Sequence, residues 1–232
     1  MPEIPVRPGE CHVWTARAVC VAHDLALLLD ERERRVYESL TEERVRAQYV
    51  TAHALLRTVL GEVLDRDPAA LSFAQGPHGK PYLADAPVEF SLSHSGELVA
   101  VALSLGAPVG VDVERVPVPS AELPLPVLSP AERAAYDLVP EPERAAAFTT
   151  YWVRKEAVLK ATGEGLRVDP ARLTVAAPDR PARLLGWRGR VRGRGAGQPH
   201  PPVRLYDLDA VDGYRGAVAL LGGPHRIVPR SR

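Results

Sequence analysis

The sequence predicts an α+β protein made of two similar α/β lobes that are related by an internal duplication. The main observation is an echo between GEVLDRDPAALSF (61–73) and GEGLRVDPARLTV (163–175), which are identical at seven of 13 positions. Each copy follows a long predicted helix and leads into a predicted strand. The tetrapeptide AVAL also occurs twice, at 100–103 and 217–220. Such punctuation can recur by chance, but two lobes of one plan explain both repeats.

The predicted boundary between the lobes divides the chain into residues 1–108 and 109–232. Five prolines from Pro117 to Pro130 mark a linker within the second lobe. Because 46% of the 232 residues are hydrophobic, the chain can bury the core of one domain or of two small lobes. Ligands often bind where two lobes meet, so we expect the functional site at this junction.

Hydrophobic periodicity and turn residues predict the elements of the first lobe in order. Thr41 is the expected N-cap of its long helix, because a threonine hydroxyl can accept a hydrogen bond from a free amide of the first turn. The expected elements are a strand at 11–21, a charged helix at 24–39, a long helix from 42 to about 60, short strands around the Gly-Pro turn of 72–83, and strands at 88–93 and 98–104.

The second lobe is predicted by the same signals. Its main helix covers about 143–161 and ends at Gly163, since glycine suits the position that follows a helix. The expected strands are 109–113 before the linker and 173–176, 183–191, 203–207 and 216–221 after the helix.

Composition excludes several classes of protein. The 29 basic and 29 acidic residues balance, and the pI near 7.1 argues against a globally basic protein that coats nucleic acid. No apolar run approaches the roughly 18 residues that span a bilayer, and the first residues lack a signal pattern, so we expect a cytoplasmic protein without membrane contact. Cys11 and Cys20 are too few for a disulfide framework or a cysteine-ligated zinc site.

Carboxylates with metal-binding chemistry occur in GVDVERV and in the main helix of the second lobe. Asp112 and Glu114 alternate on a predicted strand and therefore point to the same face. On the helix, Glu156 and Lys160 are four residues apart and share a face. A solvated strand end and an exposed helical ion pair are the plain alternatives. If Glu156 lies near the other two carboxylates, the three side chains suit Mg²⁺ or Mn²⁺. Such an ion usually takes its remaining ligands from water and from the oxygens of a phosphate.

Candidate phosphate-binding residues surround these carboxylates in the sequence. Only three of the 29 basic residues are lysines, and all three lie in GPHGKPYL or WVRKEAVLKATGEGL: Lys80, Lys155 and Lys160. Lys80 follows a glycine turn that lacks the Walker spacing, so it would act as a point charge. Ser93 and His94 lie at a predicted hairpin tip without the Gly-x-Ser-x-Gly pattern of a hydrolase, and could donate hydrogen bonds to a phosphate.

Arginines form two further basic segments. Arg34 and Arg35 belong to a cluster on the first two helices, which could simply be surface charge. The other segment, WRGRVRGRGAGQPH (187–200), carries Arg188, Arg190, Arg192 and Arg194 and leaves an RNA-binding module open as a minor alternative.

Together these segments resemble the 4′-phosphopantetheinyl transferase superfamily, in particular its larger single-chain, surfactin-synthetase-activating type that serves polyketide and nonribosomal peptide synthases. The matching motifs are GPHGKP, FSLSHS, GVDVERV and WVRKEAVLKATGEGL, in that order. The similarity covers about 29–175. Ser91 departs from the asparagine that is common in the family, and no family motif is recognised in 187–204.

The resemblance implies a fold of two halves, each with a small antiparallel sheet packed on a long helix. It implies transfer of the phosphopantetheine arm of coenzyme A to a serine of an apo acyl or peptidyl carrier protein, with release of adenosine 3′,5′-bisphosphate. Asp112, Glu114 and Glu156 would bind Mg²⁺, and Glu156 or a water would act as the base. Lys160 would hold the pyrophosphate, and the coenzyme A contacts would come from Arg34, Arg35, Lys80, Ser93, His94, Asp112, Lys155 and Lys160.

The same residues would also serve a Mg²⁺-dependent nucleotide pyrophosphohydrolase, which is the main alternative. For the transferase we expect a monomer, because two lobes supply their own interface, and no nucleic-acid partner.

Overall fold

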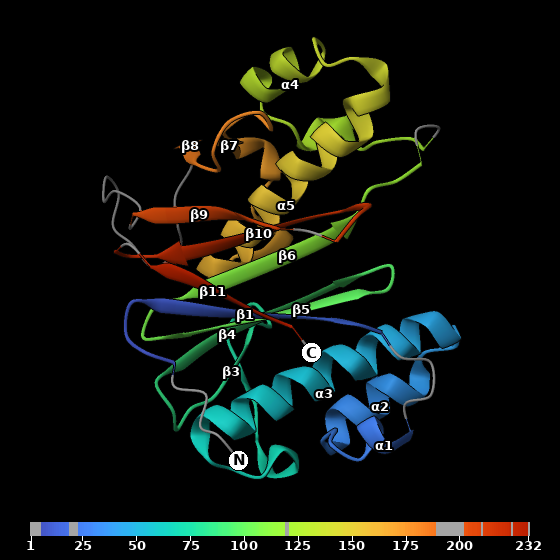
Figure 1. The fold of residues 1–232 in the computed structure, drawn as a ribbon, viewed down its shortest axis with the longest axis vertical. Helices are drawn as coiled ribbons and strands as arrows, with labels where there is room; N and C mark the ends of the chain where they lie inside the picture. Colours follow the sequence, from blue (N-terminus) through green and yellow to red (C-terminus); the bar gives the residue numbers. More distant parts are fainter. Residues whose placement is uncertain are drawn as a thin grey trace.

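The protein was analysed as a computed structural model, which describes residues 6–18, 23–118, 121–188, 202–209, 211–223 and 225–231. Two larger sheets each pack on one long helix, α3 (Glu43–Leu64) or α5 (Arg144–Thr162) (Figure 1). The expected α+β architecture of two similar lobes is confirmed. In spatial order the first sheet contains β11 (Arg226–Ser231), β1 (Glu10–Arg17), β5 (Leu98–Leu105) and β4 (Val88–Ser95), and the second contains β6 (Val109–Arg115), β10 (Tyr214–Leu221) and β9 (Val203–Leu208).

Shorter elements complete each lobe. They are α1 (His23–Ala26), α2 (Glu31–Ser39), the pair β2 (Ala74–Gln75) and β3 (Pro81–Tyr82), α4 (Pro130–Tyr136), the pair β7 (Leu173–Val175) and β8 (Leu184–Trp187), and 3-10 turns at 68–70, 125–127, 141–143, 165–167 and 170–172. Within the described residues, no helix has the length and apolar character needed to cross a membrane.

The helices of the first lobe differ from the sequence prediction at their starts. The helix expected at 24–39 is broken, because Asp30 and Glu33 form a capping box that begins α2: the Asp30 side chain accepts from the Glu33 amide, and the Glu33 side chain accepts from the Asp30 amide. Thr41 does not cap α3, whose N-cap is Glu42 without a side-chain hydrogen bond. Parts of the expected strands, 19–21 and 189–191, lie outside the described residues.

The last strand of the chain returns to the first sheet. Although it follows the second lobe in the sequence, β11 pairs in parallel with β1, with Cys11 opposite Ile227. All other pairs in the two larger sheets are antiparallel. The first sheet is therefore completed by the C-terminal end of the sequence, which no strand pattern had predicted.

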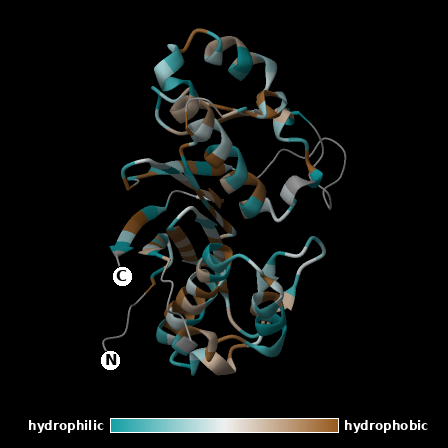
Figure 2. Ribbon diagram, turned by 90° about the vertical axis from the view of Figure 1, so that its right-hand side faces the viewer, coloured by the Kyte–Doolittle hydropathy of each residue, from teal (hydrophilic) through white to brown (hydrophobic). Residues whose placement is uncertain are grey.

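The inner strands β5 and β10 of the two larger sheets are buried on both faces. Alternate residues of β5 face in opposite directions: Val99 and Val101 pack toward α3, whereas Ala100 and Ala102 pack toward the second sheet. The layers therefore follow the order α3, first sheet, second sheet, α5 (Figure 1), and hydrophobic residues concentrate in these inner strands (Figure 2). A strand buried on both faces reads as a continuous apolar run, as β5 does.

The internal duplication is visible in the turns that follow the long helices. Asp67 accepts a hydrogen bond from the Ala69 amide after α3, and Asp169 accepts one from the Ala171 amide after α5, both at 2.9 Å. The two aspartates are equivalent positions of the sequence echo. The repeated DPA segment thus adopts one conformation in both lobes.

A second shared feature is a buried ion pair between each long helix and a capping-box glutamate. In the first lobe, Arg57 of α3 donates to Glu33 at 2.6 Å. In the second lobe, Ser129 and Glu132 form the capping box of α4, and Nζ of Lys155 lies 2.5 Å from Glu132. The side chains of this second pair are 0% and 1% exposed.

Gly110 allows β6 to lie directly against α5. A Cβ atom at this position would overlap the backbone of Ala157 and Ala161 and the Cβ of Lys160. The contact brings the residues that follow on β6, including Asp112, beside the α5 face that carries Lys160.

We expect Gly110→Ala to lower the free energy of unfolding by about 1–3 kcal/mol or more, because the new methyl group has no space. Urea denaturation measures this change. The matched control is Gly186→Ala in β8, where an added Cβ meets no atom within 4 Å. Equal stability of the two variants would contradict the close packing of β6 on α5.

We expect Lys155→Met to lower the free energy of unfolding by about 3–5 kcal/mol, because it leaves the Glu132 carboxylate buried without its charged partner. Adding Glu132→Gln removes that charge and should restore part of the loss. If the double variant is no more stable than the single one in urea denaturation, the ion pair is not the cause.

Candidate functional site

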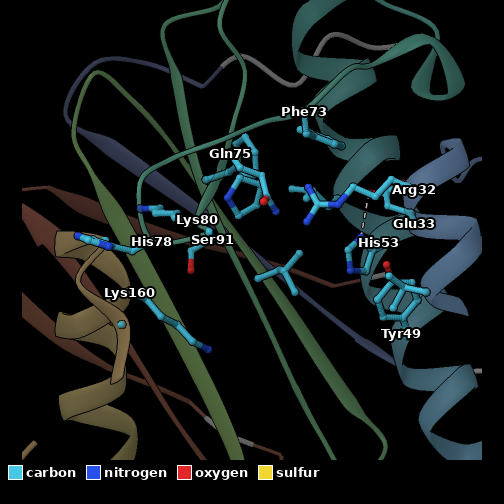
Figure 3. Close-up of a pocket in the computed structure, with 18 of the residues that line it drawn as sticks. Arg32, Glu33, Tyr49, His53, Phe73, Gln75, His78, Lys80, Ser91 and Lys160 are labelled. Carbon is cyan, nitrogen blue, oxygen red and sulfur yellow. Dashed lines mark hydrogen bonds and ion pairs between the residues drawn. The ribbon is translucent and has the colours of Figure 1, made fainter. Parts of the chain in front are cut away.

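A cavity of about 440 Å³ lies between the two lobes and is lined from both of them (Figure 3). The first lobe contributes α2, α3, β4 and the segment from Phe73 to Pro81. The second contributes the end of α5, including Lys160, and the glycines that follow it. This is the junction at which the sequence predicted a site.

Two lysines lie on one side of the cavity. Lys80 follows the tight turn from Gly76 to Gly79 and donates from Nζ to the carbonyl oxygen of Val109 at 2.8 Å. Burial lowers the pKa of Lys80, since desolvation disfavours its charge. Lys160 donates from Nζ to Asp112 Oδ1 at 2.7 Å and to the carbonyl oxygen of Val111 at 3.1 Å. The cavity therefore has two ammonium groups fixed by β6.

The opposite wall comes from α2 and α3 (Figure 3). The rings of Tyr49 and His53 stack at 4.1 Å, and His53 Nδ1 lies 2.9 Å from Glu33 Oε1. Burial, with further contributions from Glu33 and Asp30, raises the pKa of Tyr49 to about 12, so its phenol stays protonated. Arg32 projects toward the same space. This wall offers a cation and hydrogen-bonding aromatic groups.

The Glu33 carboxylate of α2 contacts both His53 and Arg57 of α3. Burial alone would raise its pKa, but the contacts of His53 and Arg57 lower the pKa of Glu33 overall. A charged Glu33 holds His53 by Nδ1, so only the other ring nitrogen of His53 is left for another partner.

The carboxylates of β6 and α5 lie next to the lysine side of the cavity. Asp112 is buried and accepts from Lys160, and its Oδ1 also accepts from the Ser93 hydroxyl at 2.8 Å. Burial raises the pKa of Glu114, and the nearby Asp112 charge adds to this. Burial, followed by the Asp112 charge, raises the pKa of Glu156 to about 7. The three acids are thus close enough to repel one another electrostatically.

The hydroxyl and imidazole expected to bind phosphate have different surroundings. The Ser93 hydroxyl donates to Asp112 and is not among the groups that line the cavity. His94 is half-buried beside it, and burial, with a smaller effect of the Lys160 charge, lowers its pKa. A neutral imidazole at this place can donate one hydrogen bond and accept another.

The carboxylates fit Mg²⁺ in their donor chemistry but are not gathered into a ready ligand set. Asp112 Oδ2 and Glu156 Oε1 are buried and have no hydrogen-bond partner among the described residues. In the described part of the chain, however, no three His, Cys, Asp or Glu side chains are arranged to hold a metal ion. Oxygen-only donors with unpartnered atoms suit Mg²⁺, and closing around it would require side-chain movement.

Three residues expected at the coenzyme A contacts lie elsewhere. Lys155 points into the core of the second lobe, where it also donates to the carbonyl oxygens of Val127 and Pro170. Arg34 donates to the carbonyl oxygen of Leu29, and Arg35 pairs with Glu31 on the surface, its side chain 70% exposed. None of the three lines the cavity.

Sequence reasoning missed Arg32, Tyr49 and His53. The available signal was the capping box at Asp30 and Glu33, which fixes the start of α2 and therefore the direction of each arginine on it. Arg34, two residues after Arg32, faces the other side of the helix. Arg35 lies three residues after Arg32, closer to its face, but pairs with Glu31 on the surface, and of the three arginines only Arg32 lines the cavity.

Known proteins that are similar to this chain are 4′-phosphopantetheinyl transferases. The sequence model of the 4′-phosphopantetheinyl transferase superfamily matches residues 108–199. The chain is 28% identical to the 4′-phosphopantetheinyl transferase HetI of Nostoc over 95% of this chain and 92% of HetI. It is 28% identical to a 4′-phosphopantetheinyl transferase of Bacillus subtilis over 59% of each chain.

A solved structure, the "Chronobacterium ammoniagenes ACPS-CoA complex", covers 52% of this chain and 98% of its own at 22% identity. The TM-score of this match is 0.38. The family match and the relatives confirm the class of enzyme expected from the sequence, and a chain of 232 residues is consistent with the larger, single-chain type. The chain is thus similar to members of the 4′-phosphopantetheinyl transferase superfamily.

Proposed function

We propose that this chain transfers the 4′-phosphopantetheine arm of coenzyme A to a serine of an apo acyl or peptidyl carrier protein and releases adenosine 3′,5′-bisphosphate. The observation that carries the proposal is the position of Lys160. It lines the cavity and at the same time contacts Asp112, so a phosphate held in the cavity would lie beside the carboxylates. We place the reaction in the cytoplasm and assign it to a monomer.

Coenzyme A is a suitable occupant of the cavity because its phosphates are anionic at several points. In this proposal Lys80 and Lys160 bind the pyrophosphate as point charges. Arg32, across the cavity, binds the 3′-phosphate, while Tyr49 and His53 offer hydrogen bonds and an aromatic surface. Ser93 lies beside the carboxylates, where it contacts the same Asp112 oxygen as Lys160, and His94 is its neighbour on β4.

The chemical step needs a base, because a serine hydroxyl is a weak nucleophile at neutral pH. Glu156 is the proposed base, directly or through a water, and its buried Oε1 has no hydrogen-bond partner in the part of the chain that the structure describes. The serine oxygen forms a bond to the phosphorus, the bond to adenosine 3′,5′-bisphosphate breaks, and Glu156 takes the serine proton. Lys160 offsets charge on the phosphoryl oxygens. Mg²⁺ held by Asp112, Glu114 and Glu156 would offset more of that charge.

The deciding experiment is incubation of the protein with coenzyme A, Mg²⁺ and a panel of apo acyl and peptidyl carrier proteins, followed by mass spectrometry of the carriers. The proposal expects the mass of one phosphopantetheine arm on at least one carrier. No gain on any carrier would overturn it, and breakdown of coenzyme A without a carrier would favour a pyrophosphohydrolase.

We expect Asp112→Asn and Glu156→Gln to fold normally by circular dichroism and to lose activity on the order of a hundredfold or more, as for a lost charge-stabilising group. Asp85→Asn is the matched control, because Asp85 is an exposed carboxylate paired with Arg66 away from the cavity. Full activity of either site variant would remove that residue from the reaction.

We expect Arg32→Ala to raise KM for coenzyme A about tenfold, since a hydrogen bond to a charged group contributes roughly 1.5–3 kcal/mol. Arg35→Ala, which removes an exposed arginine of the same helix, should leave KM unchanged. If steady-state kinetics show a higher KM for Arg35→Ala and an unchanged KM for Arg32→Ala, the 3′-phosphate contact belongs to Arg35, as the sequence predicted.

A further inference from the structure

The edges of the two larger sheets meet at β4 and β6 without a backbone ladder between them. Instead, three seryl hydroxyls on alternate positions of β4 accept hydrogen bonds from alternate amides of β6. The pairs are Ser91 with Val111 at 3.1 Å, Ser93 with Val113 at 3.3 Å, and Ser95 with Arg115 at 3.1 Å. Both partners advance by two residues, so these side chains form a regular ladder across the lobe junction.

Two of the three hydroxyls also hold a carboxylate. Ser93 donates to Asp112 Oδ1 at 2.8 Å, and Ser95 donates to Glu114 Oε2 at 2.5 Å. In both cases the same hydroxyl accepts a hydrogen bond from the amide of the next residue on β6, which is Val113 after Asp112 and Arg115 after Glu114. A hydroxyl has one donor and two acceptor sites, so one serine can make both bonds.

Ser91 has the amide contact but no carboxylate beside it, because the corresponding position on β6 is Gly110. Its hydroxyl oxygen instead faces the cavity (Figure 3). The ladder therefore contains its own comparison: three serines join the lobes, and only the second and third contact an acid.

The hairpin tip that carries Ser95 is fixed from both lobes. Gln48 of α3 donates to the carbonyl oxygen of Gly96, and the Glu97 amide donates to the Tyr214 hydroxyl of β10 at 2.9 Å. A side chain at Gly96 would collide with Tyr214. Ser95 thus has a fixed position relative to Glu114, whereas Lys160 donates to Asp112 and to the carbonyl oxygen of Val111.

We propose that Ser95 is a positioning residue: it orients the Glu114 carboxylate and ties that orientation to the closed junction between the lobes. Ser93 has the same role for Asp112. The inference rests on the proposed function in giving these carboxylates a place in the reaction. A partner that orients a metal-binding carboxylate typically changes metal affinity or activity about 10–100-fold when it is removed.

The test compares Ser95→Ala, Ser95→Thr and Ser91→Ala. Mn²⁺ binding to the protein alone is measured by electron paramagnetic resonance, stability by thermal unfolding, and transfer by kcat and KM for coenzyme A. Ser91→Ala is a control for stability and Mn²⁺ affinity, not for activity, because Ser91 lines the cavity. Ser104→Ala, which loses a buried seryl hydrogen bond to Ala107 at the other end of β5, is the control for activity.

We expect Ser95→Ala and Ser91→Ala to lower the unfolding temperature by a similar amount, roughly 2–4 °C each. Only Ser95→Ala should weaken Mn²⁺ binding and lower kcat, by about tenfold or more, with KM for coenzyme A unchanged. Ser95→Thr keeps the hydroxyl and should restore both. If Ser95→Ala does not fold, Ser95→Cys, which keeps the size of the side chain, takes its place in the comparison.

Wild-type Mn²⁺ affinity and kcat in Ser95→Ala would overturn the positioning role. So would equal losses of Mn²⁺ affinity in Ser95→Ala and Ser91→Ala, because the effect would then come from the lobe junction alone. Failure of the wild-type protein to modify any carrier would overturn the proposed function, and a selective loss of Mn²⁺ affinity in Ser95→Ala would still support the positioning of Glu114.

Discussion

Each of the two larger sheets packs one face on a long helix and the other face on the second sheet, so the inner strands have no side that faces water. Strands such as β5 and β10 are consequently apolar along most of their length. Polar chemistry has to lie at the sheet edges, and the two edge strands that meet are β4 and β6. The candidate site lies there because it is the place in the layered core where charged groups can reach a cavity.

The duplication supplies one structural device that the two lobes use differently. In each lobe a basic side chain of the long helix forms an ion pair with the capping-box glutamate of a short helix. The pairs are Arg57 with Glu33 and Lys155 with Glu132. In the first lobe Glu33 also reaches His53 and the cavity wall. In the second lobe the pair is enclosed by Val127 and Pro170, and the same device supports only the core. Of the two ion pairs, that of the first lobe therefore adjoins the cavity proposed for coenzyme A.

The parts of the fold that the sequence predicted are those that depend on local pattern. The echo predicted two lobes, and GVDVERV with Glu156 and Lys160 predicted carboxylates near a lysine. In the structure Lys160 contacts Asp112. Lys155 shares a helix with Glu156 and Lys160, yet it faces the core, because its direction depends on how α5 rotates against α4. Likewise β11 joins β1 across the whole chain, and RIVPRS carries no local signal for its partner.

The electrostatics of the carboxylates explain why the surrounding packing has to be rigid. Burial and mutual repulsion raise the pKa of Glu114 and Glu156, and unpartnered oxygens remain on Asp112 and Glu156. A buried polar atom without a partner lowers the free energy of unfolding by roughly 1–3 kcal/mol. The contacts among the three carboxylates therefore do not stabilise their own arrangement. The close contact at Gly110 and the clamped hairpin tip hold it instead. A ligand that supplies the missing partners binds only the folded state, so its binding raises the free energy of unfolding of the protein.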